Sequence, residues 1–548
     1  MSRWSSSLVP VTVFAFVLVA IAIVAVGSIG TASGSGAPQI VEVYPNTAAE
    51  GNAGEHVVVS FPEPTDLNGW ELADDRSTVP LGNGTAEGRV AFSTHPGYAA
   101  VFAEDPVHGL DGFIALSQEG DHIRLLYEGV VVDEVRYDRA PRAQRWVRLG
   151  PDSGPGHEEW RWIPERATGF EAESYEVEEA TVFVLPDAPE LPTEVLSSAE
   201  DRLLFAGYTV SSERAVGELL AAHDRGVEVV VLVDGTPVGG QTEHEAEALD
   251  RLADAGVEVR VFDGDRQRYR FHHAKYAVSD DRVLVLTENW KPSGTEGRSS
   301  RGWGVSVTDD AVAEDVVRVF EADSYGHDTV VWNEYREDRE FVGSEPANAT
   351  YPAEFRAKTL PADSVRVVAA PDNAEGETIA MLAGAEESIR VQQVSVGDTD
   401  HPFVEETMVA AERGVEVEYV LDGSWYVASE NREFVRYVEE RRTEDGLPVD
   451  ARVVEPRSRF EKVHTKGVIV DDRRVLVSSV NWNNNSVRNN RELGLLVESE
   501  EVGGFYASVF RSDWYGGRWQ LPVEFGAGVA ISVGLAGWIG KRAIRFEG

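Results

Sequence analysis

Two stretches of the sequence repeat one pattern and decide the fold of most of the chain: His273-Ala274-Lys275 with Asp280 after it, and His464-Thr465-Lys466 with Asp471. In both, the aspartate lies at the same offset from the histidine. Each copy is followed by an apolar stretch and then by a small hydroxyl residue, a spacer, Asn and Trp: Thr287-Glu288-Asn289-Trp290 and Ser479-Val480-Asn481-Trp482. One copy carries little information, whereas two copies with matched tails predict a duplicated half-site.

The segments that precede the two copies match as well. In each, Ala-Ala near the end of an amphipathic pattern leads through Gly226 or Gly414 into a Val-rich run that ends at Asp234-Gly235 or Asp422-Gly423. The pattern indicates a helix, a tight turn at Gly and a buried strand of a βαβ unit. A repeat of about two hundred residues is too long for a solenoid. We therefore expect a duplicated α/β domain, with mixed sheets flanked by helices and one active site where the halves meet.

The repeated residue types suit chemistry on a phosphodiester. Residues i and i+2 of a strand point to one face, so each His is expected beside its Lys. Lys275 and Lys466 would neutralise the phosphoryl oxygens, while one imidazole attacks phosphorus and the other protonates the leaving oxygen. Neutral donors to the same oxygens would come from Thr287, Asn289, Ser479 and Asn481.

This pattern resembles the phospholipase D superfamily, whose motif is H-x-K-x4-D followed by G-S-x-N. The resemblance covers roughly 194–515. It implies a phosphodiesterase with a phosphohistidine intermediate and with neither metal nor cofactor. The sequence contains no H-E-x-x-H or similar ligand cluster and no cysteine, which excludes thiolate metal sites, disulfides and Cys nucleophiles.

The resemblance also implies a carboxylate after each motif that accepts the Nδ1 proton of the motif histidine. Glu492 holds this place after the second copy, so we expect it to orient His464. The first half has Gly302 at the corresponding place, and the candidate replacements are Glu296 or an acidic residue from elsewhere in the chain. The nucleophile stays open between the two histidines: the family more often uses the N-terminal one, whereas the carboxylate favours His464.

The two motif aspartates are expected to be structural. Asp280 and Asp471 follow the strands that carry the motifs, where an aspartate commonly caps a turn. We favour this role over a catalytic one.

The composition is strongly acidic but compatible with folded cores. The formal charge is −44 and 42% of residues are apolar. Lysine is scarce, being confined to Lys275, Lys291, Lys358, Lys462, Lys466 and Lys541. Such a surface resembles proteins of extremely salt-loving organisms, so the charge is interpreted as an adaptation to salt and not as a signal for a partner.

The two ends of the chain indicate export. Residues 1–37 contain an apolar run after Arg3 and are expected to be a signal peptide or an N-terminal membrane anchor. Residues 521–548 combine a second apolar run with a basic tail and are a candidate C-terminal transmembrane segment, with a buried core helix as the alternative. The body is expected at the cell surface, membrane-anchored, or secreted if the first run is cleaved and the second does not span.

A different domain lies ahead of the repeats. Residues 38–139 alternate short β-rich runs with turns, which predicts a β-sandwich. The order Ile40-x-Glu42-Val43-x-Pro45-Asn46 and later Asp66-Leu67-x-Gly69-Trp70 resembles an immunoglobulin-like, lamin-tail domain. Residues 140–193 are expected to form a connector, followed by repeat 1 over 194–345 and repeat 2 over 346–516.

The preferred substrate is a phospholipid headgroup ester, cleaved by hydrolysis or exchanged by transphosphatidylation, because tethering would hold the site near lipid. The expected partners are this phospholipid or another phosphodiester and the membrane, and no protein partner is inferable. One alternative is an extracellular nuclease, although no basic stripe marks a nucleic-acid groove. Another is a surface-binding protein whose active site has decayed. This alternative stays open because Gly302 stands where a carboxylate is expected.

Overall fold

The computed structural model describes residues 37–47, 53–100, 102–103, 105–148, 160–263, 267–337, 339–343, 346–454 and 459–516. The predicted terminal segments, 1–37 and 521–548, therefore lie outside the described residues, apart from residue 37 itself. Within the described ranges, no helix combines the length and the apolar character needed to cross a membrane.

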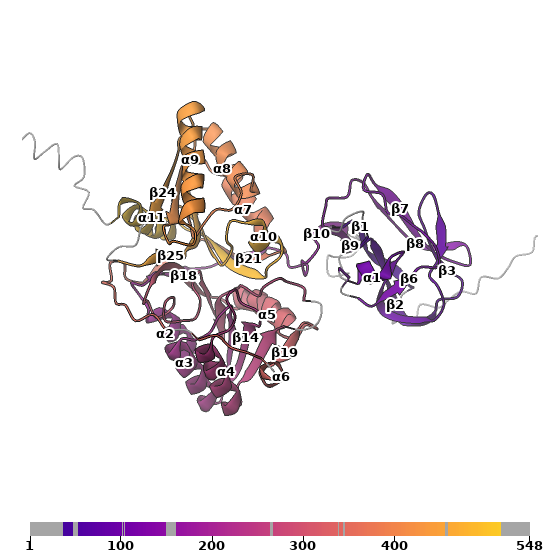
Figure 1. Cartoon of the computed structure of the whole chain (residues 1–548), viewed down its shortest axis with the longest axis horizontal. Helices are drawn as coiled ribbons and strands as arrows, with labels where there is room; N and C mark the ends of the chain where they lie inside the picture. Colours follow the sequence, from indigo (N-terminus) through magenta and orange to yellow (C-terminus); the bar gives the residue numbers. More distant parts are fainter. Residues whose placement is uncertain are drawn as a thin grey trace, which may run out of the picture.

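The N-terminal unit consists of two sheets around one core and stands beside the rest of the molecule (Figure 1). One sheet has the order β10-β9-β1-β2-β5-β6 and the other β4-β3-β7-β8. Val59 and Phe61 of the first sheet share a buried cluster with Leu72 and Leu125 of the second. The predicted β-rich character of 38–139 is confirmed, and its lamin-tail-like, immunoglobulin-like class stays a prediction.

The bounds of these elements are β1 (Gln39–Asn46), β2 (His56–Asp66), β3 (Trp70–Ala73), β4 (Thr78–Pro80), β5 (Thr85–Ser93), α1 (Pro96–Ala99), β6 (Val107–Gly109), β7 (Asp121–Tyr127), β8 (Val130–Tyr137), β9 (Gln144–Arg148) and β10 (Trp160–Pro164).

In the stretch 140–193, expected as a connector, the described residues contribute strands to the sheets instead. β9 pairs with β1 and β10, where the rings of Trp146 and Trp160 stack at 6.1 Å. Further along, β11 (Ser174–Glu176) joins the sheet of the second repeat, and β12 (Glu179–Leu185) joins that of the first. The Pro-, Glu- and Arg-rich composition gave no sign of these short strands, whose tryptophans, Trp146, Trp160 and Trp162, are partly buried against the core of the N-terminal unit.

The first repeat is a mixed sheet with the strand path β19-β15-β14-β13-β16-β17-β18-β12-β20. Its elements are α2 (Leu191–Ser197), β13 (Arg202–Gly207), α3 (Glu213–Arg225), β14 (Glu228–Asp234), α4 (Glu243–Ala255), β15 (Glu258–Phe262), β16 (Tyr276–Ser279), β17 (Arg282–Leu286), β18 (Ser300–Thr308), α5 (Asp310–Ser324), β19 (Thr329–Val331), α6 (Trp332–Arg336) and β20 (Lys358–Pro361). β20 lies in the part of the sequence expected as repeat 2, so the repeat boundary is crossed by strand pairing.

The second repeat has the strand order β11-β21-β28-β27-β26-β22-β23-β24. Its elements are β21 (Ser364–Ala370), α7 (Ala374–Ala383), β22 (Ser388–Gln393), α8 (Pro402–Glu412), β23 (Glu416–Asp422), α9 (Ala428–Glu444), β24 (Val449–Val454), β25 (Lys462–Val463), β26 (Lys466–Val470), β27 (Arg474–Ser478), α10 (Asn484–Arg488), β28 (Glu492–Glu498) and α11 (Glu500–Tyr515).

The predicted helix, glycine turn and buried strand occur in both repeats. α3 is capped by Ser212, whose side chain accepts from the backbone N–H of Ala215, and it ends at Gly226 with φ of 93°. Gly414 after α8 has φ of 98°. Only glycine adopts such values without steric cost, which is why the chain can turn there into the buried parallel strands β14 and β23.

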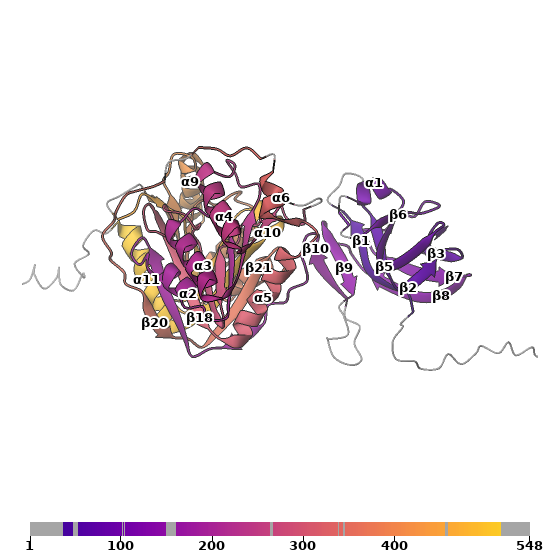
Figure 2. The same ribbon diagram turned by 90° about the horizontal axis from the view of Figure 1, so that it is seen from below.

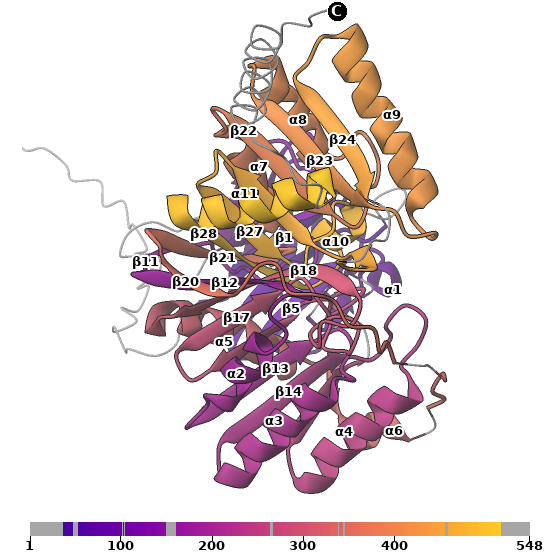
Figure 3. The same cartoon turned by 90° about the vertical axis from the view of Figure 1, so that its left-hand side faces the viewer.

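The two repeats form one layered body. Helices α3 and α4 cover the outer face of the first sheet (Figure 2), while α8 and α9 cover that of the second (Figure 3). Between the sheets lies a shared core to which both repeats contribute, including Val305 and Phe320 from the first and Val477 and Tyr506 from the second. The halves are therefore joined by apolar burial, which is the dominant favourable term in folding.

Backbone pairing between the repeats is reciprocal. β25, just before His464, pairs in parallel with the start of β18. In the same way, His272, just before His273, forms an isolated parallel bridge with Arg491 at the start of β28. Each motif is thus fixed to the opposite repeat, and both motifs meet at the interface.

Candidate active site

The two motif histidines are positioned by the backbone of the opposite repeat. The N–H of His273 donates to the carbonyl of Arg491 at 2.8 Å, and the N–H of His464 donates to the carbonyl of Arg301 at 2.9 Å. Each imidazole keeps some exposure, 13% for His273 and 19% for His464, although its neighbours are buried. The structure therefore brings both motifs to one site that a ligand can reach.

His273 has a carboxylate partner that is itself held by hydrogen bonds. Its Nδ1 lies 2.8 and 3.0 Å from the two carboxylate oxygens of Glu492, which also accepts from Asn490 Nδ2 at 3.0 Å and from Ser486 Oγ. Although burial acts to raise the pKa of Glu492, the neighbouring His273 brings that pKa down to about 2. The carboxylate fixes the proton on Nδ1 and leaves Nε2 unprotonated. The prediction that Glu492 orients His464 is wrong, because the start of β28 faces the motif of the other repeat.

The partner of His464 is Glu288, the spacer residue of the first tail. Its Oε2 lies 3.3 Å from His464 Nδ1. A Cβ added at Gly302 would lie 2.2 Å from Glu288 Cγ, so the Glu288 side chain occupies the space that a residue at 302 would need. Glu296, the candidate replacement, instead accepts from Ser212 Oγ at 2.9 Å and pairs with Arg298 at 3.1 Å. The first repeat therefore supplies this carboxylate from position 288 and not from position 302.

Both motif lysines are buried beside their histidines. Lys466 Nζ lies 3.2 Å from each ring nitrogen of His464 and donates to its carbonyl at 2.8 Å. Lys275 Nζ donates to the carbonyl of His273 and lies 5.2 Å from the centre of the Tyr208 ring. Burial lowers the pKa of Lys466 to about 7 against the opposing effect of Glu288, and it holds that of Lys275 well below its ordinary value. An anionic ligand would restore their positive charge.

Burial also lowers the pKa values of the two histidines. The pKa of His273 falls to about 4, although Glu492 acts in the opposite direction. That of His464 is held well below its ordinary value, first by burial and then by the surrounding lysines. Both rings are accordingly neutral near pH 7 in the absence of a ligand, which suits a nucleophile and leaves the proton donor dependent on an incoming anion.

The neutral tail residues lie beside the motifs. The Thr287 hydroxyl accepts from the N–H of Trp303, and the Ser479 hydroxyl accepts from the N–H of Leu493, both at 3.0 Å. These two residues directly follow β17 and β27, so the hydrogen bonds lie at the ends of those strands. Asn289 is buried, and its Oδ1 makes no hydrogen bond with the described residues, whereas Asn481 is half-buried. Contact with a phosphoryl oxygen stays a prediction for all four of these tail residues.

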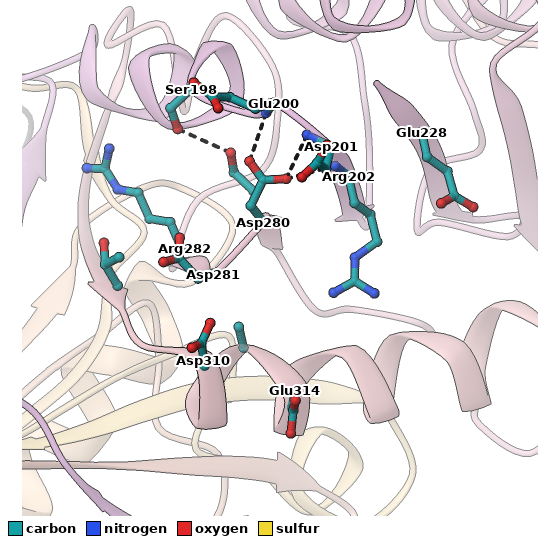
Figure 4. A pocket seen from close by; sticks show the side chains of 13 residues that line it. Ser198, Glu200, Asp201, Arg202, Glu228, Asp280, Asp281, Arg282, Asp310 and Glu314 are labelled. Atoms are coloured by element: carbon teal, nitrogen blue, oxygen red, sulfur yellow. Dashed lines mark hydrogen bonds between the residues drawn. The ribbon is translucent and has the colours of Figure 1, made fainter. Parts of the chain in front are cut away.

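The motif aspartates lie at turns on the far ends of the strands. The Asp280 carboxylate accepts from the N–H groups of Glu200, Asp201 and Arg202 at 2.8–3.0 Å (Figure 4). Asp471 accepts equivalently from residues 386–388. Both have φ near 55°. Neither contacts a motif histidine, and the cavity of about 820 Å³ beside Asp280 is lined chiefly by acidic and other polar side chains.

Three residues of the site were assigned no role from the sequence: Glu288 and the two arginines Arg301 and Arg491. Arg301 and Arg491 are fully buried and lie one residue before Gly302 and Glu492. Arg491 pairs with Asp323 and Asp372, and Arg301 pairs with Asp187 and Asp513. Two features of the sequence could have indicated these residues. Arg301-Gly302 aligns with Arg491-Glu492, so the arginine occurs in both repeats, and the spacer of the first tail is Glu288 where that of the second is Val480.

Comparison with known proteins agrees with the duplication. Residues 193–324 and 378–514 match the family described as "Cardiolipin synthase, PLD-like domain". These ranges lie within the two repeats, so the chain carries a duplicated phospholipase D-like domain.

Individual relatives are more distant. A curated relative, the DISARM protein DrmC of Bacillus paralicheniformis, is 30% identical over 124 residues, which is 22% of this chain and 48% of that protein. This chain thus spans about half the length of the curated relative it matches.

Solved structures similar to this chain include phosphatidylserine synthase of Haemophilus influenzae, with 15% identity over 60% of this chain and 84% of that one and a TM-score of 0.44. They also include the phospholipase D family member Nuc of Salmonella typhimurium, with 18% identity over 30% of this chain and 99% of that one and a TM-score of 0.25.

Proposed function

We propose that the protein cleaves or exchanges phosphodiesters of phospholipid headgroups through a phosphohistidine. The observation that carries this proposal is the pair of crossed contacts in the site, His273 with Glu492 and His464 with Glu288, with a buried lysine beside each ring. A decayed site would not be expected to keep a carboxylate beside each of the two histidines. The intact geometry therefore supports an enzyme over a binding protein.

His273 is the proposed nucleophile because its carboxylate contact is the shorter of the two. Its Nε2 attacks phosphorus, a P–N bond forms, the bond to the leaving oxygen breaks, and His464 gives its proton to that oxygen. Water or an alcohol then attacks phosphorus after passing its proton to His464, and the P–N bond breaks. The two lysines stabilise the charge on the non-bridging oxygens in both steps.

Exposed apolar side chains near the site favour a lipid. Val238 and Trp425 are 79% and 90% exposed and lie on the loops after β14 and β23. Those strands end at Asp234 and Asp422, which accept backbone N–H groups from His272 and Val463. The loops therefore start next to the motifs, and apolar groups in this place suit contact with acyl chains or the membrane interface. We extend the proposal to a membrane-anchored, exported enzyme.

The same Trp425 could stack on a nucleobase, so the test includes DNA. Headgroup release from phospholipid vesicles and cleavage of DNA are measured with the full chain, with His273→Ala and His464→Ala, and with His122→Ala on β7 as the matched control. We expect lipid turnover to fall by at least about 10³-fold in the two motif variants only. DNA cleavage with the same pattern, and no lipid turnover, would replace the lipid proposal by a nuclease.

Trapping of the intermediate tests the assignment of the nucleophile. With a phosphodiester that has a good leaving group, His464→Ala is expected to accumulate an acid-labile phosphohistidine, because the first step no longer needs a proton donor while the second still needs a base. His273→Ala is expected to form none. Accumulation in His273→Ala instead would assign the nucleophile to His464.

A further inference from the structure

Lysine is concentrated at the site in a chain that has very little of it. Of the lysines in the described residues, only Lys358 lies elsewhere; Lys275, Lys291, Lys462 and Lys466 all act on the buried Glu288. Lys275 and Lys466 belong to the motifs. Lys291 and Lys462 do not, and the mechanism described above does not use them.

Lys291 and Lys462 form no ion pair with a carboxylate of the described residues. The ion pairs found in the described residues include neither of them, although the chain carries 94 acidic residues. Both are only partly exposed. Burial, and then the neighbouring charge of Lys462, lowers the pKa of Lys291. Glu288 and Glu245 act to raise that pKa, but burial and Lys462 outweigh them. Two partly buried cations close to each other are therefore incompletely compensated, which points to a ligand that supplies further negative charge.

Both lysines line one cavity of about 450 Å³. Its other polar lining includes the hydroxyl residues Thr209, Ser211, Thr242, Ser293 and Ser299, together with His244. Two acids also reach it, but both are already engaged: Glu245 accepts from the N–H of Val210, and Glu461 accepts from Ser299 Oγ, each at 2.7 Å. Burial raises the pKa of Glu245 to about 7, which further reduces the negative charge in the cavity.

Comparison of the two repeats shows that the two lysines have no basic counterpart at the equivalent positions. Lys462 precedes His464 by two residues, and the residue in the same position before His273 is Phe271. Lys291 follows the first Asn-Trp pair, and Asn483 follows the second. Among the groups that chiefly affect the pKa of each histidine, these two lysines appear for His464 and not for His273.

We propose that the cavity lined by Lys291 and Lys462 binds a second phosphoryl group, carried by the leaving group of the substrate. In an in-line displacement by His273, the leaving oxygen departs toward the proton donor His464, and these two lysines lie on that side. The hydroxyls would complete the hydrogen bonds of the second phosphoryl group. This inference rests on the proposed function, because it takes His464 as the proton donor.

The main test compares two headgroups. Turnover of vesicles of phosphatidylglycerol phosphate and of phosphatidylglycerol is measured with the full chain and with Lys291→Met, Lys462→Met and Lys358→Met. The unchanged chain is expected to prefer the terminal phosphate by at least about tenfold in kcat/KM, and either site variant is expected to lose most of that preference. Lys358→Met, the matched control on β20, should keep it. The same ratio of kcat/KM for the two headgroups in all four proteins would overturn the proposal.

A binding measurement separates this inference from the proposed function. Calorimetric titration with inorganic pyrophosphate and with inorganic phosphate needs no turnover. Tighter binding of pyrophosphate by the unchanged chain, lost in Lys291→Met/Lys462→Met and recovered in Lys291→Arg/Lys462→Arg, would support the second site even if no lipid is cleaved. The same pyrophosphate affinity in all of these proteins would overturn it.

Discussion

At the scale of single residues, the site depends on where two carboxylates lie. Glu288 is the more informative of the two because burial, acting against the nearby lysines, raises its pKa to about 7. Its ionised form favours the protonated state of His464, and its neutral form does not. The activity that depends on this contact should therefore be absent at low pH and should rise as the pH passes through about 7.

Replacement of Glu288 by Gln tests this pH dependence. Gln resembles the protonated side chain at every pH, so kcat/KM for Glu288→Gln should equal that of the unchanged chain below about pH 6 and be roughly tenfold lower above pH 8. The measurement is a pH profile of kcat/KM, which reports the free enzyme. A constant ratio across the profile would contradict the assigned contact with His464.

Placing a carboxylate at position 302 tests whether Glu288 takes the place of a side chain there. Gly302→Glu alone should lower activity by at least about 10²-fold, because its Cβ would lie 2.2 Å from Glu288 Cγ. Glu288→Ala with Gly302→Glu removes that clash and restores a carboxylate near His464, so it should recover part of the lost turnover. Glu288→Ala alone is the control. A double variant no better than Gly302→Glu would mean that the two positions are not interchangeable.

At the scale of the elements, the duplicated βαβ units were predictable and the way they meet was not. Apolar periodicity, together with Gly226 and Gly414, shows the helix, turn and strand from local sequence alone. The partner of His273 depends on which strand start faces the motif across the interface, and local sequence carries no signal for that. Likewise, the role of Glu288 depends on the missing side chain at Gly302, which lies beside it only in the folded chain.

The turn aspartates can be tested through stability. Although burial acts to raise the pKa of Asp471, the backbone N–H donors lower it below the ordinary value. Asp471→Asn should therefore cost about 1–3 kcal/mol of unfolding free energy at pH 7. Because the folded-state pKa is the lower one, this contribution is fully present above the unfolded pKa of about 3.9 and disappears as the pH falls through the folded value. Denaturant titrations at pH 7 and under acid conditions check it, and a pH-independent cost would contradict it.

At the scale of the whole molecule, the repeats are held together by buried ion pairs as well as by the shared core. Arg491 of the second repeat pairs with Asp323 of the first, and it also donates to Thr168 and Tyr269. Removal of the fully buried guanidinium would take its positive charge away from the buried Asp323 carboxylate, which would keep only the contacts with His272 and Tyr269 among the described residues.

Arg491→Met is accordingly expected to cost about 3–5 kcal/mol of unfolding free energy, since it removes the positive charge that compensates the buried carboxylates of Asp323 and Asp372. Arg488→Met, three residues earlier in the chain and paired with Glu375 at the surface, should cost at most about 1 kcal/mol. Denaturant titrations of the two variants provide the comparison. Equal costs would show that the buried network contributes no more than an exposed pair.

The crossing of the two imidazole–carboxylate contacts has a consequence for how such a chain can diverge. Each repeat encodes the histidine of one contact and the carboxylate of the other. Neither copy could therefore have been inherited as an active unit by itself, and an ancestral single repeat would have needed a twin to complete its chemistry. A substitution of Glu288 is therefore expected to impair the histidine of the second repeat, and one of Glu492 that of the first, so that neither repeat can vary at its carboxylate without a consequence in the other.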